Sequence, residues 1–367
     1  MTKIKRIGIL TGGGDCPGLN AAIRGIGKSA LFHNIEVIGI QDGYQGLIEN
    51  RTHPLTMREL SGILTRGGTI LGTNNKCSPE KYHVGNDADG TPTYVNAVDK
   101  CLATIEEQQI EVLFVIGGDG TFTCTKPLVE AGLPCIGVPK TIDNDIFGTD
   151  LTIGFTTALR IGTMSLDRLH STGDSHHRVM ICELMGRNAG WLTLGSGLAS
   201  GSDVILIPEI PYDLDVVCQF AEDRRNSDSG FTIIACAEGA RPLHGQQVVS
   251  KRIETSPDPI RLGGIGQQIA FKIEEQTGIE TRTTTLGHIQ RGGEPAATDR
   301  VVATAFSTAA FELAMQGKFN VMVGLREGHM ETYDILEVAN RQRLVPLDHR
   351  FIRAARAMHT CFGDESL

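Results

Sequence analysis

The sequence predicts an α/β fold of two domains, each built around a parallel sheet. Short apolar runs alternate with longer amphipathic segments along the chain, and strands that alternate with helices form βαβ units. The chain has 367 residues, of which 40% are hydrophobic, so it can bury a sizeable core. The apolar runs predict nine strands, which is a high number for one doubly wound sheet of this length. Two domains are therefore favoured.

The predicted elements follow from the apolar runs and from the periodicity between them. The strands are Ile4–Leu10, Glu36–Ile40, Val112–Ile116, Pro134–Val138, Arg178–Leu184, Asp203–Ile207, Phe231–Ala237, Thr281–Leu286 and Asn320–Leu325. The helices include Leu19–Leu31, Thr93–Gln108, Gly154–His170, Asp213–Arg225 and Ala297–Met315. Two polar stretches, Asn74–Gly90 and Arg241–Pro259, are predicted as surface insertions. Many of the 44 glycines directly follow strands, at the sheet edge where α/β proteins bind ligands.

Charge and cysteine content exclude several classes of function. The net charge is −9 at pH 7, so the chain lacks the basic field of a nucleic-acid-binding protein. Its nine cysteines form no CxxC pair, which argues against a zinc site and fits reduced cytosolic thiols. No apolar run is long enough for a signal peptide or a membrane span. We expect a soluble cytoplasmic protein that binds neither nucleic acid nor membrane.

The first strand leads into the glycine-rich sequence TGGGDCPG, residues 11–18, which precedes a helix. Such a turn presents free backbone N–H groups and the positive end of the helix dipole to an anion. Pro17 stands where the dinucleotide fingerprint requires glycine, and Ala22 stands where a Walker A loop requires it. The loop is therefore an anion site of another kind, or a tight turn without a ligand.

Two more loops follow predicted strands. In the sequence GGDGT, residues 117–121, the glycines would let the backbone approach phosphates, and Asp119 could hold a magnesium ion. The alternative is a turn whose aspartate caps the next helix. In PKTIDND, residues 139–145, Asp143 and Asp145 point the same way if the chain stays extended. One carboxylate could act as a base and the other could lie near a metal ion. The alternatives are a polar turn and a calcium-binding loop. Phe147, at the fifth position of such a loop, argues against calcium.

Cationic residues lie beside several strand ends. Arginine binds phosphate through two hydrogen bonds at once, and histidine can donate to a phosphate oxygen. Each such residue alone is more often part of a surface ion pair. Their shared placement after strands favours phosphate binding by the set Arg178, Arg187, Arg282, His288 and Arg291.

Taken together, these motifs resemble those of the phosphofructokinase family. The resemblance runs from about Ile4 to at least Gly293, through TGGGDCPGLNAAIRG, RGGTILGT, IGGDGT, PKTIDNDI, CELMGRNAGW and GHIQRGG. It implies two similar three-layer α/β/α Rossmann-like domains with the active site in the cleft between them. A nucleotide domain would comprise residues 1–154 and 290–340, and a fructose 6-phosphate domain would comprise residues 155–289 and 341–367.

The resemblance also implies an activity and a role for each matching residue. The activity is magnesium-dependent transfer of the γ-phosphoryl group of ATP to the 1-hydroxyl of fructose 6-phosphate. The catalytic residues would be Asp143 as base, Lys140 and Arg187, and Asp119 would hold the metal. The donor would be bound by Gly14, Asn75, Lys76, Gly117, Gly118, Asp119, Gly120 and Thr121. The sugar phosphate would be bound by Thr141, Ile142, Asp143, Asp145, Arg178, Met185, Gly186, Arg187, Glu238, Arg282, His288 and Arg291.

Some positions depart from the family pattern or bear on the assembly. Asn75 occupies the register of a phosphate-binding arginine, and Lys76 could supply only a point charge. Arg178 and Arg282 match residues that reach a neighbouring subunit's site in this family, which implies a homo-oligomer; we expect four subunits.

The phosphoryl donor depends on two residues. Gly120 matches ATP users, because a carboxylate there would crowd and repel the α-phosphate, whereas Lys140 is typical of pyrophosphate users. A clash excludes a ligand more strongly than an extra cation does, so ATP is expected. A pyrophosphate-dependent transferase on the same sugar remains the first alternative. A catalytically silent sugar-phosphate-binding protein is the second, although Asp119, Asp143 and Arg291 are all present.

Overall fold

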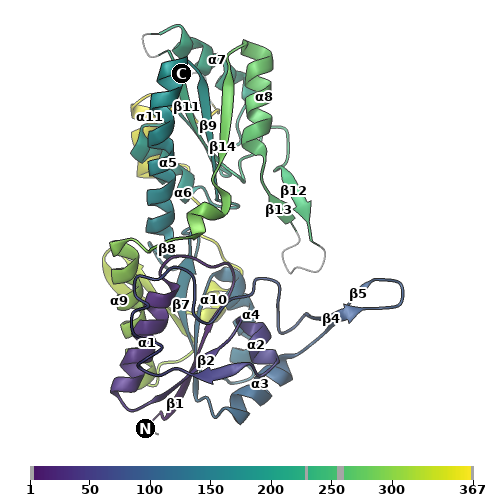
Figure 1. Cartoon of the computed structure of the whole chain (residues 1–367), viewed down its shortest axis with the longest axis vertical. Helices are drawn as coiled ribbons and strands as arrows, with labels where there is room; N and C mark the ends of the chain where they lie inside the picture. The colour runs from purple at the N-terminus through teal and green to yellow at the C-terminus, as the bar shows by residue number, and fades with distance from the viewer. Residues whose placement is uncertain (1–3, 228–229, 254–259, 365–367) are drawn as a thin grey trace.

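The computed structural model describes residues 4–227, 230–253 and 260–364. Residues 254–259 of the second predicted insertion lie outside these ranges, and so do residues 1–3 and 365–367 at the ends of the two predicted domains. Figure 1 shows two α/β units stacked along the long axis of the molecule, with the N-terminus at the foot of the lower unit. No helix among the described residues is long and apolar enough to cross a lipid bilayer.

The lower unit is built on an eight-stranded sheet with the order β16-β15-β7-β6-β1-β2-β3, and β8 pairs with β7. The five central strands are parallel, whereas β3 and β16 run antiparallel at the two edges. The strands are β1 Arg6–Thr11, β2 Glu36–Ile40, β3 Thr52–Pro54, β6 Val112–Gly117, β7 Cys135–Thr141, β8 Ile153–Gly154, β15 Val321–Arg326 and β16 His329–Asp334. The direction of strand progression reverses between β1 and β6, so the carboxyl ends of these two strands border the crevice where doubly wound sheets bind ligands.

Helices cover both faces of this sheet. Alternate residues of β1 and β6 point to opposite sides: Ile9 and Phe114 pack against α1 and α9, whereas Leu10 and Leu113 pack against α2, α3, α4 and α10. The helices are α1 Leu19–Phe32, α2 Tyr44–Ile48, α3 Val98–Glu107, α4 Asp119–Glu130, α9 Ala297–Met315 and α10 Ile335–Val338. The unit therefore has three layers.

The upper unit repeats this plan on a smaller scale. Its four parallel strands have the order β10-β11-β9-β14. They are β9 Val179–Leu184, β10 Val204–Leu206, β11 Thr232–Ala237 and β14 Thr281–Thr285. One face packs against α5, α6 and α11, and the other packs against α7 and α8. The helices are α5 Phe155–His176, α6 Trp191–Ser200, α7 Leu214–Arg225, α8 Ile265–Thr277, α11 Arg350–Ala357 and the short 3-10 helix η1 Gly287–Arg291.

The predicted fold class, two three-layer α/β/α units, is confirmed. We propose the predicted division of the chain as its domain boundaries. The chain returns to the lower unit after residue 290 and to the upper unit after residue 340, as this division requires. After α5–α8, strand β15 pairs with β7 in the lower sheet. Near the end of the chain, Ile352 of α11 packs into the core of the upper unit. The lower unit is called the donor domain below, and the upper unit is called the sugar domain.

One predicted helix needs correction, and each predicted insertion contains a strand. The helix predicted over Thr93–Gln108 begins only at Val98, and Pro92–Val95 is the second strand of a hairpin with β4, Tyr82–Asn86. Asp87 fixes the turn of this hairpin by accepting hydrogen bonds from the N–H groups of Asp89 and Thr91. The second insertion contains β12 Val249–Arg252, which pairs with β13 Ile260–Leu262.

Candidate active site

The glycine-rich loop after β1 lies against the loop after β6. A Cβ atom on Gly12 would come within 2.5 Å of the side chain of Thr121, and one on Gly117 would come within 2.3 Å of it. Both distances are too short for carbon atoms, so only glycine lets the two loops close around Thr121. Gly13 has a φ of 77°, which glycine adopts without strain. The predicted donor loops are therefore adjacent in space.

Lys140 holds the glycine-rich loop through hydrogen bonds to its backbone carbonyls. It is buried in β7, and its Nζ donates to the carbonyl oxygens of Gly12 at 2.7 Å and of Gly14 at 2.5 Å. Burial lowers the pKa of Lys140 to about 8. The family resemblance implied a catalytic role for Lys140, but two of its three N–H groups already donate to carbonyls of this loop.

Three carboxylates gather beyond the ends of β6 and β7. Asp119 is the first residue of α4, and Asp143 and Asp145 lie in the loop after β7. Burial raises the pKa of Asp143; the charge of Arg291 opposes this shift and that of Asp119 adds to it. Burial also raises the pKa of Asp145 strongly, and the charges of Asp143 and Asp119 raise it further. Oδ1 of Asp143 is buried and has no hydrogen-bond partner among the described residues, so it is an acceptor without a donor.

Hydrogen bonds between side chains and the backbone fix the loop that carries Asp143. Thr141 ends β7, and its Oγ1 accepts from the N–H of Asp143 at 3.2 Å. Ile142 is buried in the core beside Ile153, so only its backbone is left for a ligand. Asn144 is in a left-handed conformation with a φ of 54°, and its side chain donates to the Asp150 carbonyl. Such a loop is set before any ligand binds.

The sugar domain contributes its loops from the carboxyl ends of β9 and β11. Met185, Gly186 and Arg187 follow β9, and Glu238 follows β11. Burial raises the pKa of Glu238 to about 7, with a further contribution from the charge of Asp143. The charge of Arg187 conversely lowers the pKa of Asp143. These two couplings place Arg187 and Glu238 near the carboxylates of the donor domain.

The 3-10 helix η1 carries the next two predicted phosphate ligands. Arg291 reaches across to the glycine-rich loop, where its Nη1 donates to the Asp15 carbonyl at 3.1 Å. A Cβ atom on Gly14 would come within 2.7 Å of this nitrogen, so any other residue at position 14 would displace the Arg291 guanidinium from its present position. His288 is exposed, and between the two, Gln290 accepts from the N–H of Met185 at 2.7 Å. Gln290, which was not among the predicted site residues, thus links η1 to the loop after β9.

The remaining donor-side residues lie at the surface. A Cβ atom on Gly120 would meet nothing within 4 Å, so neither packing nor backbone strain requires glycine at this position. Gly118 also has room for a side chain. Asn75 and Lys76 are exposed, and they follow Thr73, whose Oγ1 lies 2.7 Å from the Gly13 carbonyl and donates to it. The structure thus brings this segment next to the glycine-rich loop.

Arg178 and Arg282 do not join the cleft within this chain. The sequence interpretation placed them after strands, and this was wrong, because Arg178 precedes β9 and Arg282 is the second residue of β14. Both lie at the amino ends of parallel strands, opposite to the edge that carries Met185 and Arg187. Arg178 pairs with Glu280 at 2.8 Å, and Arg282 also pairs with Glu280.

Two residues that sequence reasoning missed contact Asp119 and Asp145, one at a carboxylate and one at a backbone carbonyl. Nε2 of Gln342 donates to Oδ2 of Asp119 at 3.0 Å. The N–H of Arg343 donates to the Asp145 carbonyl at 2.7 Å. The sequence contains no motif around these residues. Their only feature in the sequence is the polar run 340–343 after a short helix, and such a run is typical of any loop.

The described residues contain no cluster of three or more histidine, cysteine, aspartate or glutamate side chains that could hold a metal ion. Magnesium needs no such cluster, because it is commonly held by one or two carboxylates together with substrate phosphates. Asp119 lies at the crevice and is the carboxylate available for that arrangement.

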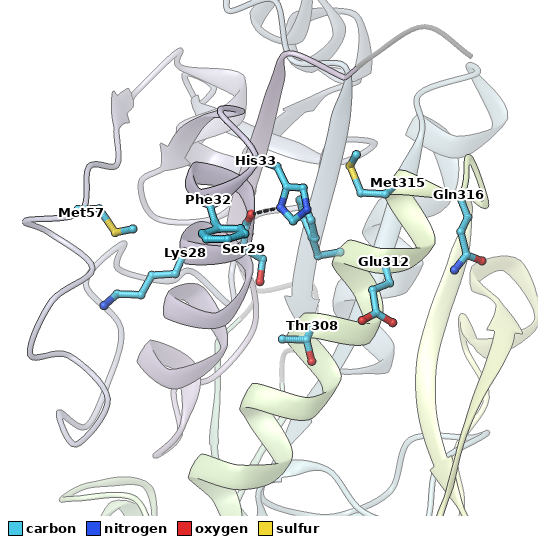
Figure 2. A pocket seen from close by; sticks show the side chains of 10 residues that line it. Lys28, Ser29, Phe32, His33, Met57, Thr308, Glu312, Met315 and Gln316 are labelled. Atoms are coloured by element: carbon cyan, nitrogen blue, oxygen red, sulfur yellow. Dashed lines mark hydrogen bonds between the residues drawn. The ribbon is translucent and has the colours of Figure 1, made fainter.

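A separate hollow of about 700 Å³ lies on the outer side of the donor domain, between the ends of α1 and α9. Figure 2 shows its lining, in which Phe32, Met57 and Met315 are prominent and His33 donates from Nδ1 to the Ser29 carbonyl at 2.8 Å. None of its lining residues is a predicted site residue. The chemistry expected from the sequence therefore belongs to the cleft and not to this hollow.

Known proteins share both the sequence and the fold. Residues 6–314 match the family model described as phosphofructokinase. The ATP-dependent 6-phosphofructokinase 2 of Clostridium perfringens is 45% identical over 99% of this chain and 100% of its own length. The ATP-dependent 6-phosphofructokinase of Spirochaeta thermophila is 46% identical over 98% of each chain.

Solved structures extend the comparison. Phosphofructokinase from Pichia pastoris superposes with a TM-score of 0.77 at 28% identity, over 92% of this chain and 36% of that longer chain. The pyrophosphate-dependent enzyme from Marinobacter aquaeolei superposes with a TM-score of 0.79 over 99% of this chain and 93% of its own. At 21% identity, the second likeness concerns the fold alone. The extent of the family match and the full-length relatives together show that this chain belongs to the phosphofructokinase family.

Proposed function

We propose that this chain is an ATP-dependent 6-phosphofructokinase in which Asp143 accepts the proton from the 1-hydroxyl of fructose 6-phosphate. The activity is that of relatives 45% and 46% identical over nearly the whole chain. The role of Asp143 depends on one observation, the buried Oδ1 that has no donor among the described residues. A sugar hydroxyl is a donor of suitable size for this acceptor.

The reaction needs in-line placement and charge neutralisation more than covalent help from the protein. The bond from O1 of the sugar to the γ-phosphorus forms while the bond from this phosphorus to the β-γ bridging oxygen breaks, and ADP leaves. Asp143 takes the proton of O1 as its nucleophilic character develops. The raised pKa of Asp143 favours this transfer. Arg187, whose charge acts on Asp143, carries the positive charge that stabilises the phosphoryl group in transit.

Magnesium fits the donor side of this site. Asp119 would hold it with phosphate oxygens of ATP, and the ion would supply neutralisation of the charge on the β- and γ-phosphates. The chain's own part is to aim the Asp119 carboxylate and to present backbone N–H groups from the loops after β1 and β6. Gly117, Gly118 and Thr121 contribute to the second of these loops.

Gly120 supports ATP as the donor. The space beside it is open, so a nucleotide can approach, whereas an aspartate side chain would project into this space and repel the α-phosphate. Lys140, the residue that favoured pyrophosphate in the sequence, donates to two loop carbonyls. Its presence is thus compatible with either donor.

For the sugar phosphate, we propose that Arg291 and His288 bind the 6-phosphate and that Thr141, Met185 and Glu238 contact the sugar. Arg178 and Arg282 would serve the site of a neighbouring subunit, since they lie at the edge of the sheet away from their own cleft. Exposed apolar side chains such as Phe32, which is 80% exposed, fit an assembled protein. A homotetramer is the assembly we propose.

The test is formation of fructose 1,6-bisphosphate from fructose 6-phosphate and magnesium, with ATP or pyrophosphate as the sole donor. We expect turnover with ATP alone. Turnover with pyrophosphate and none with ATP would overturn the donor assignment. If neither donor is used, the enzyme assignment fails, and a silent sugar-phosphate-binding protein takes its place. Gly120→Asp is the matched variant, and it should keep the fold while losing ATP turnover.

A further inference from the structure

Residues 340–345, called the strap below, run from α10 in the donor domain towards α11 in the sugar domain. At its start, Thr123 of α4 donates from Oγ1 to Oδ1 of Asn340 at 3.0 Å. At its end, the N–H of Val345 donates to Oε1 of Glu209 at 2.9 Å, and Trp191 donates from Nε1 to the Arg343 carbonyl at 2.8 Å. The strap is therefore fixed to both domains.

The middle of the strap lies along the catalytic loop. Gln342 forms an antiparallel bridge with Ile146, and the N–H of Arg343 donates to the Asp145 carbonyl. In an extended chain, successive side chains point to opposite sides. The guanidinium of Arg341 lies 3.4 Å from the ring centre of Phe147, and that of Arg343 lies 4.2 Å from the ring centre of Trp191. Gln342, between two arginines, is the residue whose side chain reaches Asp119.

An amide is well suited to hold Asp119. The carboxylate lies near Asp143 and Asp145, and like charges at short range disfavour one another. The amide donates to Oδ2 without adding a positive charge that would compete with a cation. Gln342 is the one donor to the Asp119 side chain within the described part of the chain. Oδ1 of Asp119 is thereby left for another ligand.

We propose that Gln342 is a positioning residue that fixes the Asp119 carboxylate for the magnesium ion of the donor. This inference rests on the proposed function, because magnesium enters the site with ATP. Groups that orient a metal ligand from outside the coordination sphere typically change metal affinity by about 10- to 100-fold when they are removed. The strap carries Gln342, so contacts in both domains determine how Asp119 is aimed.

The experiment measures metal binding directly, with Mn²⁺ as a paramagnetic substitute for magnesium. The full chain is titrated with Mn²⁺ in the presence of ADP, and free Mn²⁺ is followed by electron paramagnetic resonance. Gln342→Met keeps the length of the side chain and removes the donor. We expect Mn²⁺ binding about tenfold weaker than in the parent, and a similar rise in the Mg²⁺ concentration for half-maximal rate. The KM for fructose 6-phosphate should change by less than about twofold, because Gln342 lies on the donor side.

Arg341→Gln is the matched control. Arg341 belongs to the same strap, but its guanidinium stacks on the ring of Phe147 and does not contact Asp119. It should bind Mn²⁺ as the parent does. The proposal is overturned if Gln342→Met binds Mn²⁺ with the affinity of the parent, or if Arg341→Gln weakens binding equally. Gln342→Ala, which can introduce no clash, decides the question if the methionine variant does not fold. Mn²⁺ binding needs no turnover, so the comparison of the variants holds even if the parent does not use ATP and fructose 6-phosphate. An inactive parent would contradict the proposed function but not the role of Gln342.

Discussion

On the donor side of the cleft, hydrogen bonds hold the glycine-rich loop and Asp119, whereas several cations expected on the sugar side lie at the surface. Lys140 and Thr73 bind carbonyls of the glycine-rich loop, and Gln342 binds Asp119. By contrast, His288 is exposed, and the side chain of Arg282 is 51% exposed in ion pairs with glutamates. The donor side is thus organised before substrate arrives, while the sugar side has charges that a phosphate or a second subunit would cover.

This difference has a physical reason. A loop that binds polyphosphate through backbone N–H groups must hold its shape against the repulsion of the ligand's own charges, and it does so by using buried donors on its carbonyls. A cation that binds a phosphate must instead stay accessible until the ligand arrives, and long charged side chains lose little by remaining solvated. Substitutions on the two sides should therefore have different effects on substrate binding and on stability.

The largest effect is expected for Asp143→Asn. The change removes the proton acceptor but keeps the size of the side chain, so kcat should fall by about 10²- to 10⁴-fold. Stability should not fall, because the asparagine side chain would bury no charge where burial now raises the pKa of the carboxyl. Steady-state kinetics and equilibrium binding of both substrates provide the measurement. A variant with near-normal kcat would remove Asp143 from the role of base.

Arg291→Gln is expected to come next, because Arg291 serves both sides of the cleft. Loss of a charged hydrogen bond to the 6-phosphate should raise the KM for fructose 6-phosphate by about 10- to 100-fold. The charge of Arg291 also lowers the pKa of Asp143 more than any other residue does. Its removal should raise this pKa, so the acid limb of kcat should move to higher pH, since Asp143 must be ionised to act. An unchanged pH profile of kcat would mean that the two groups are not coupled.

Lys140→Met tests the glycine-rich loop on the donor side. The change leaves the carbonyls of Gly12 and Gly14 without their donor, which costs about 1–3 kcal/mol and should raise the KM for ATP by about tenfold. In the parent, Lys140 has a pKa lowered to about 8, below that of an unfolded lysine. The unfolded chain therefore binds more protons between about pH 8 and 10.4, so the Lys140 contribution to the free energy of unfolding should rise with pH there. Thermal or denaturant unfolding of the parent and of Lys140→Met across this range would reveal it, because the methionine variant should lack this rise.

Local signals in the sequence were enough for most of the fold and for much of the site. The strand Glu36–Ile40 and the helix Ala297–Met315 have their predicted bounds, because apolar runs and helical periodicity are properties of neighbouring residues. The glycine-rich loops were found for the same reason, since a close approach such as that of Gly12 to Thr121 requires glycine at a fixed place in the turn.

Contacts between distant segments could not be predicted in this way. Gln342 and Asp119 are 223 positions apart, and nothing in the residues around Gln342 indicates their hydrogen bond. Residues 93–95 of the strand Pro92–Val95 were mistaken for the start of a helix, because a four-residue strand has too few positions to show its own period. The position of Arg282 at the amino end of β14 depends on the sheet register, which pairs it with Met180.

The smallest effect within one chain is expected for Arg282→Ala. Its ion pairs with Glu280 and Glu274 are exposed, so the free energy of unfolding should change by less than about 1 kcal/mol. If Arg282 completes a neighbouring subunit's site, the KM for fructose 6-phosphate should nevertheless rise by several-fold, and the specific activity of the parent should fall on dilution. Lys126→Ala, which removes another exposed ion pair, should change neither quantity. If the parent is a monomer that keeps full activity on dilution, no second subunit is needed to complete the sugar side. The two sides would then differ in exposure and not in assembly.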